Sequence, residues 1–171
     1  CKGDLKMIVL KPISKERIWG TPRLHQYSGD SHIDRIGSVY SVSGIEELSN
    51  EILAGDEHRT LYEAVKAVPE KFGITPGVDY PIIISFTSAD ENLSIQVHPT
   101  DEYAITHENA LYGKSESWYF IEPPSEGWIY ADSLIEDKKE IKRSILNGDY
   151  ESVVGKIIVS KDDVVYIPSG T

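Results

Sequence analysis

The chain has 171 residues and a formal net charge of -11 at neutral pH, and 40% of its residues are hydrophobic. This length fits one domain with a real core. The acidic balance argues against a nucleic-acid partner, because phosphate backbones are bound by clustered Lys and Arg. No apolar run is long enough to cross a bilayer, which argues against a membrane partner.

The single cysteine, Cys1, excludes an internal disulfide and a zinc site built from thiolates. A chain that starts at Cys could be a processed lipoprotein, but no preceding signal is visible and the remaining residues look like those of a cytoplasmic enzyme. The sequence favours an upstream extension over residues 1–6, with Met7 opening the native protein. We therefore expect a cytoplasmic, reducing environment.

The N-terminal half begins with β signals and then turns helical. Residues 7–10 and 38–43 are predicted strands, and the Gly- and Pro-containing stretch 17–34 between them is a predicted loop. Residues 44–54 and 60–72 carry apolar side chains at helical spacing, so both are predicted helices.

From residue 80 onward short strands dominate. We expect strands over residues 80–86, 93–98, 117–121, 156–159 and 164–167. The apolar run of the first of these is typical of a strand buried on both faces. Thr100 is a predicted N-cap of a helix ending near Gly113, and Gly148 is expected to stop a charged helix over residues 136–146. Short strands with helices between them indicate a closed or sandwiched β core.

Gln96 and His98 are the first candidate functional residues. In a strand, side chains two apart share a face, so both would point the same way. An imidazole nitrogen and an amide oxygen can both bind a borderline cation such as zinc. The alternative is a hydrogen-bonded core histidine with a polar neighbour, and spacing alone favours that alternative.

Glu116 and Lys114 form the second candidate pair. Glu116 opens a predicted strand beside Trp118 and could supply a carboxylate ligand, although most Glu side chains are simply solvated. Lys114, two residues earlier, is either a solvated charge or a cation near a substrate.

Several blocks together resemble type I mannose-6-phosphate isomerases, a cupin family. Leu-Ser-Ile-Gln-Val-His-Pro at residues 93–99 is similar to the family signature. Gly-Lys-Ser-Glu-Ser-Trp-Tyr at residues 113–119 resembles its Gly-Lys-Thr-Glu-x-Trp-Tyr block. Residues 166–171 match the start of its Pro-x-Gly-Thr-x-His-Ala block, and Glu-Arg-Ile-Trp-Gly at residues 16–20 is similar to the N-terminus of its short bacterial members.

The resemblance implies a mainly β fold, a cupin-type jelly roll with inserted helices, forming one metal-binding domain over residues 1–171. It implies one zinc ion held by Gln96, His98, Glu116 and a second His just beyond Thr171. The implied activity is the interconversion of mannose 6-phosphate and fructose 6-phosphate, with Lys114 as the catalytic acid–base and Ser94 facing the sugar phosphate.

The sequence departs from the family pattern at several points. Ser85 stands where the family commonly has a Lys that faces the substrate, and residues 37–40 replace a usual Gly-Glu-x-Trp. The second His and the family's C-terminal part, with its active-site Arg, are absent, so we expect little activity from residues 1–171 alone. Two other functions stay open: a metal-binding sugar sensor without catalysis, and an isomerase of another sugar phosphate.

Overall fold

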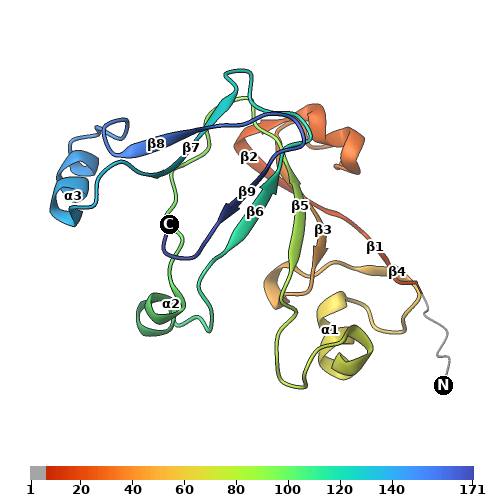
Figure 1. Cartoon of the computed structure of the whole chain (residues 1–171). Helices are drawn as coiled ribbons and strands as arrows, with labels where there is room; N and C mark the ends of the chain where they lie inside the picture. Colours follow the sequence, from red (N-terminus) through yellow and green to blue (C-terminus); the bar gives the residue numbers. More distant parts are fainter. Residues whose placement is uncertain (1–6) are drawn as a thin grey trace. The chain divides into compact units, whose positions relative to one another are not determined.

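The computed structural model describes residues 7–171, so the extension expected over residues 1–6 lies outside the described part. The chain divides into two compact units, Cys1–Ser94 and Ile95–Thr171, and each is described by itself. The elements of both units are labelled in Figure 1. Within residues 7–171, no helix is both long and apolar enough to span a bilayer.

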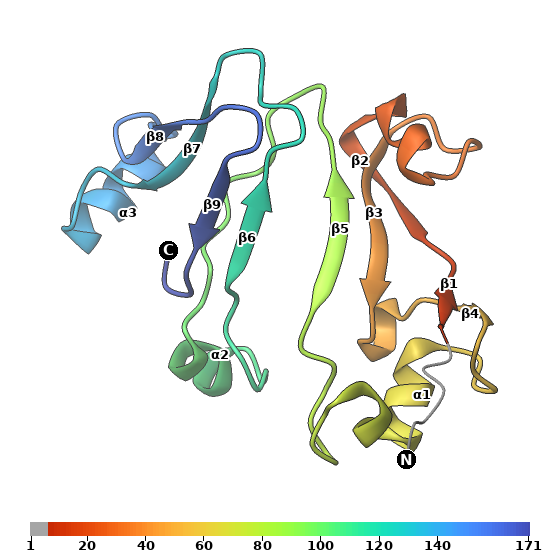
Figure 2. The same ribbon diagram turned by 45° about the vertical axis from the view of Figure 1, so that its right-hand side comes forward.

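The first unit is built around a three-stranded antiparallel sheet. Strand β3 (Ile36–Ser43) lies in the middle, with β2 (Ile13–Thr21) on one side and β5 (Ile83–Thr87) on the other. Figure 2 shows the three strands side by side. Strand β2 runs through the start of the predicted loop 17–34, so that loop prediction is wrong up to Thr21.

The main core of this unit lies where the 3-10 helix η1 (Pro22–Tyr27) covers the sheet. Leu24, Ile36 and Val39 are almost fully buried there. The Tyr27 ring stacks on Phe86 of β5 with the ring centroids 4.6 Å apart, which is a favourable offset arrangement. The core thus joins η1, β3 and β5 through aromatic and branched side chains.

The isoleucines that precede Phe86 do not follow the predicted burial. Residues 80–86 were expected to be buried on both faces, but Ile83 and Ile84 are each about half exposed, at 46% and 52%. The strand itself is confirmed as β5, with only Phe86 packed on the core. This part of the burial prediction is wrong, because neither isoleucine belongs to the core cluster against which Phe86 packs.

The predicted helix over residues 44–54 is also wrong. These residues form a short 3-10 helix, η2 (Glu46–Leu48), followed by strand β4 (Ile52–Ala54), which pairs with β1 (Val9–Leu10). The buried Asn50 explains the difference. Its side-chain amide donates to the backbone oxygens of Lys11 and Tyr40, and its oxygen accepts from the Ser43 amide. A continuous helix would lose these tertiary bonds.

Helix α1 (Leu61–Ala67) confirms the start of the predicted helix 60–72. Thr60 and Glu63 form a capping box at its N-terminus. The α-helix ends before Pro69, and the next four residues form the 3-10 helix η3 (Pro69–Phe72). Proline has no amide hydrogen to donate, so the break falls where the sequence places it.

A buried carboxylate anchors the loop between β4 and α1. The Asp56 side chain is 3% exposed and accepts hydrogen bonds from the His58 backbone and ring and from the Lys71 ammonium. The bond from Lys71, and then those from His58, hold the pKa of Asp56 well below its usual range. This cluster ties the loop to η3.

The second unit contains two antiparallel ribbons and two helices. Strand β6 (Glu116–Tyr119) pairs with β9 (Val164–Ile167), and β7 (Trp128–Ser133) pairs with β8 (Val154–Ile158). Strand β9 has its predicted bounds, β6 and β8 overlap the predicted strands, and β7 was not predicted. Below the strands in Figure 2, helix α2 (Asp101–His107) precedes β6.

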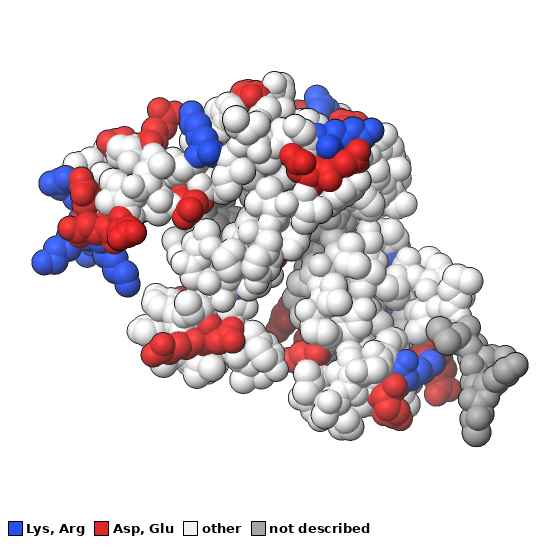
Figure 3. Space-filling model, in the orientation of Figure 1, with Lys and Arg blue, Asp and Glu red and all other residues white. Residues whose placement is uncertain are grey.

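Both helices of this unit follow their sequence signals. The Thr100 hydroxyl caps α2 as expected by accepting the Tyr103 amide, although the helix ends earlier than Gly113. Helix α3 (Lys138–Leu146) lies within the predicted range and ends before Gly148, whose φ is +75°. Its Lys and Arg side chains form the basic group at the left of Figure 3.

Candidate metal centre

Four of the five predicted site residues lie together at the start of β6, within the second unit. The Lys114 ammonium is 3.3 Å from Gln96 Oε1 and 3.3 Å from Glu116 Oε2. His98 Nε2 is 3.4 Å from Glu116 Oε1. The fifth, Ser94, is exposed and is the last residue of the other unit. The structure therefore gathers an imidazole, an amide oxygen, a carboxylate and an ammonium.

His98 is held by the turn that follows β9. Its amide donates to the Thr171 carbonyl at 2.6 Å, and the Gly170 amide donates to the His98 carbonyl at 2.7 Å. Gly170 has a φ of +94°, which favours glycine. Residues 93–98 do not form the predicted strand, because no strand is assigned to them in the described structure. The turn, rather than strand alternation, thus fixes the position of His98.

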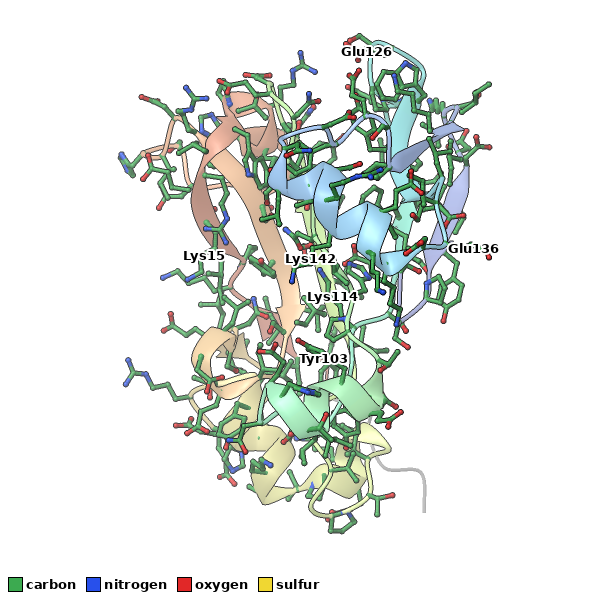
Figure 4. All side chains as sticks on the ribbon, turned by 90° about the vertical axis from the view of Figure 1, so that its left-hand side faces the viewer. Lys15, Tyr103, Lys114, Glu126, Glu136 and Lys142 are labelled. Carbon is green, nitrogen blue, oxygen red and sulfur yellow. The ribbon has the colours of Figure 1, made fainter. Side chains whose placement is uncertain are left out.

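Lys114 is held from the other side by the start of α2. The Lys114 amide donates to the Pro99 carbonyl at 3.0 Å, and the Gly113 amide donates to Asp101 Oδ1 at 2.8 Å. A Cβ on Gly113 would lie 2.3 Å from the Pro99 oxygen, so only glycine permits this approach. Figure 4 labels Lys114 near α2, the helix that carries Tyr103.

Glu116 is oriented by a neighbour on its own strand. Residues 116 and 118 share a face of β6, and Trp118 Nε1 donates to Glu116 Oε1 at 2.9 Å. The same oxygen faces His98, while Oε2 faces Lys114. Trp118 is thus a positioning residue that the sequence reasoning did not assign, although its spacing of two from Glu116 is a usable signal.

The His98 imidazole is suited to bind a cation. His98 is 5% exposed, and its Nδ1 atom is buried without a hydrogen-bond partner among the described residues. Burial lowers the pKa of His98 from its ordinary value and the Lys114 charge lowers it further, while Glu116 opposes the shift. The ring is therefore neutral near pH 7, which is the state that ligates metals.

The donor spacing fits a tetrahedral ion. Zinc binds His nitrogen and carboxylate oxygen at about 2.0–2.2 Å, so two such ligands of a tetrahedral ion lie roughly 3.4 Å apart. His98 Nε2 and Glu116 Oε1 are 3.4 Å apart. Across residues 7–171, no group of three or more His, Cys, Asp and Glu side chains is placed to hold a metal ion. Gln96 would therefore have to supply the third donor, and the set is one short of the four that zinc usually takes.

Comparisons with known proteins support the resemblance seen in the motifs. The chain is 34% identical to the Bacillus subtilis protein named probable mannose-6-phosphate isomerase GmuF and 32% identical to ManA, a mannose-6-phosphate isomerase of that organism. Both matches cover 96% of this chain, and 53% and 52% of the relatives. The chain thus spans about half the length of these curated relatives. No family model matches it.

The fold comparison gives the same result. The crystal structure of the mannose 6-phosphate isomerase from Bacillus subtilis superposes with a TM-score of 0.87 at 30% identity. The match covers 95% of this chain and 52% of the other. The predicted fold class, mainly β of the cupin type with inserted helices, is confirmed.

Proposed function

Because this chain resembles the mannose-6-phosphate isomerases along 96% of its length, we propose that it is the metal-binding part of such an isomerase. The proposed reaction interconverts mannose 6-phosphate and fructose 6-phosphate. The observation that carries the proposal is the convergence of Gln96, His98 and Glu116 beside the Lys114 ammonium. These are the residues that the motif resemblance assigns to the metal and to proton transfer.

Gln96 Oε1, His98 Nε2 and one Glu116 oxygen would hold the ion, which we propose to be zinc. A divalent ion bound there would act as a Lewis acid that polarises the carbonyl of an open-chain sugar. The buried, neutral His98 supplies a nitrogen lone pair, and Trp118 keeps the Glu116 carboxylate turned toward it. This arrangement fixes the donors before the substrate arrives.

Lys114 is the proposed acid–base group. The isomerisation moves a proton between C1 and C2 of the sugar, so a group within hydrogen-bond reach of both carbons must carry it. The Lys114 ammonium lies beside the proposed ligands, and its side chain is 44% exposed. The assignment of Ser94 to the sugar phosphate rests on the resemblance alone.

Metal binding is the first test of this proposal. Titration of Zn²⁺ into the chain should give one site, and His98→Ala should weaken it at least tenfold, because it removes the only nitrogen donor of the set. His107→Ala is a matched control, since His107 lies on α2 of the same unit, stacked on Tyr103. Equal loss in both variants, or no binding to the unmodified chain, would contradict the proposed centre.

Turnover is the second test. Conversion of mannose 6-phosphate would be followed by coupling fructose 6-phosphate to glucose 6-phosphate formation, in the intact gene product loaded with Zn²⁺. We expect turnover that is lost in Glu116→Gln. A metal-loaded protein that shows no conversion would refute the enzyme proposal.

Ser85 favours one alternative function. It lies in β5, paired with Tyr40 of β3, where the resemblance expects a lysine, so this position brings no cation to a phosphorylated sugar. A non-catalytic sugar-binding module would bind mannose 6-phosphate in calorimetry without converting it. An isomerase of another sugar phosphate would instead convert a different substrate in a panel of aldose phosphates.

A further inference from the structure

We propose that the Lys114 ammonium is the resident cation of the metal-free centre, and that a divalent ion must displace it. This inference rests on the proposed metal centre, and it holds that the Lys114 ammonium competes with the divalent ion for that centre. Lys114 Nζ lies 3.3 Å from Gln96 Oε1, a proposed donor of that centre, and 3.3 Å from Glu116 Oε2, the second oxygen of the carboxylate whose Oε1 faces His98. Without metal, the ammonium neutralises the carboxylate and satisfies the amide oxygen.

Electrostatic repulsion keeps the Lys114 ammonium and a divalent ion from occupying the centre at the same time. An ion held by Gln96 and Glu116 would lie beside the present ammonium, which contacts both residues. Two cations separated by about 4 Å repel each other by more than thermal energy even at the effective dielectric of a protein surface. Both cations would also compete for the single amide oxygen of Gln96. Binding of the ion therefore requires the ammonium to leave.

The local structure lets the side chain leave while the backbone stays. The Lys114 amide is bonded to Pro99 and the preceding Gly113 amide to Asp101, so the main chain is fixed. The Lys114 side chain is 44% exposed, and a lysine has a flexible four-carbon stem. Displacement thus needs only side-chain rotation into solvent.

This exchange links metal loading to the acid–base group. In the metal-free chain Lys114 is bonded to Gln96 and Glu116 and is not available to a substrate. Once displaced, it is released on the open side of the centre. The order of events is therefore metal first, then a Lys114 that can reach the sugar.

Zn²⁺ calorimetry on three variants tests the exchange. Lys114→Met keeps the length but removes the charge, so we expect Zn²⁺ to bind about fivefold tighter, the order expected when partly exposed ion-pair contacts no longer compete. Lys114→Arg keeps the cation and should stay within about twofold of the unmodified chain. Lys142→Met, on the exposed face of α3, makes the same change in net charge and should have no effect.

Nuclear magnetic resonance of the Lys114 side chain gives a readout that does not depend on affinity. Its 15Nζ signal, assigned by its absence in Lys114→Met, should shift toward that of a solvated lysine when Zn²⁺ is added. A signal that stays in place on metal saturation, or Lys114→Met binding Zn²⁺ no tighter than the unmodified chain, would overturn the exchange while leaving the metal centre intact. Absence of Zn²⁺ binding in both proteins would overturn both.

Discussion

Replacement of Gly113 by alanine should damage the centre without touching any proposed ligand. The new Cβ would lie 2.3 Å from the Pro99 oxygen and 2.8 Å from the Asp101 nitrogen, against about 3.5 Å for ordinary contact. Both neighbours are backbone atoms, so the segment that carries Lys114 must move away. The hydrogen bonds from Gly113 to Asp101 and from Lys114 to Pro99 are then lost.

The expected cost follows from these contacts. Overpacking costs about 1–3 kcal/mol, and each of the two lost hydrogen bonds about 1 kcal/mol, so the free energy of unfolding should fall by about 3–5 kcal/mol. Zn²⁺ affinity should fall about tenfold, as for other changes to residues that support metal ligands. Urea unfolding followed by circular dichroism measures the first effect, and calorimetry measures the second.

Gly148→Ala is the matched control for this experiment. Gly148 has a φ of +75° and no atom within 4 Å of an added Cβ, so alanine there meets backbone strain of about 1–2 kcal/mol but no clash. Its Zn²⁺ affinity should not change. A Gly113→Ala variant whose free energy of unfolding stays within about 0.5 kcal/mol of the unmodified chain, and which binds Zn²⁺ equally well, would show that the added Cβ is accommodated.

Three further outcomes are expected. Trp118→Phe removes the donor to Glu116 and should weaken Zn²⁺ binding about tenfold in calorimetry; unchanged affinity would mean that Trp118 does not position the carboxylate. Gly170→Ala, at a φ of +94°, should destabilise the chain by about 1–2 kcal/mol and speed hydrogen exchange of its own amide, unless the turn tolerates a side chain. Asp56→Asn should cost about 1–3 kcal/mol at pH 7. The pKa of Asp56 is depressed in the folded state, so the stabilisation from its carboxylate is complete above the pKa of an unfolded Asp, near 3.9. This stabilisation is lost as the pH falls below that value. The urea midpoints of the variant and the unmodified chain should therefore converge toward pH 2.

Local signals in the sequence predicted much of the second unit. The N-cap at Thr100, the stop at Gly148 and the strand Val164–Ile167 depend on residues close in the chain, and the structure confirms them. The helix expected over residues 44–54 was wrong because Asn50 gains bonds to distant backbone groups. Periodicity carries no information about such partners.

In the candidate site, too, local motifs were informative and long-range contacts were not predictable. Motif blocks grouped Gln96, His98 and Glu116. In the structure His98 contacts Glu116, and Lys114 contacts both Gln96 and Glu116, while the role of these residues as metal ligands stays a prediction. The reason for the grouping was not accessible from the sequence. Spacing suggested a strand over residues 93–98. Instead, His98 donates to Thr171 and accepts from Gly170, and these bonds join segments more than 70 residues apart.

The bond from Trp118 to Glu116 gives this centre an optical signal of its own. An indole that donates to a carboxylate changes its emission when the charge on that carboxylate is neutralised. Zn²⁺ arrival at Glu116 would therefore be visible from Trp118, and the Trp118→Phe variant shows which part of the emission change comes from this indole. The rate at which the ion enters could be followed by stopped-flow fluorescence on the unlabelled chain.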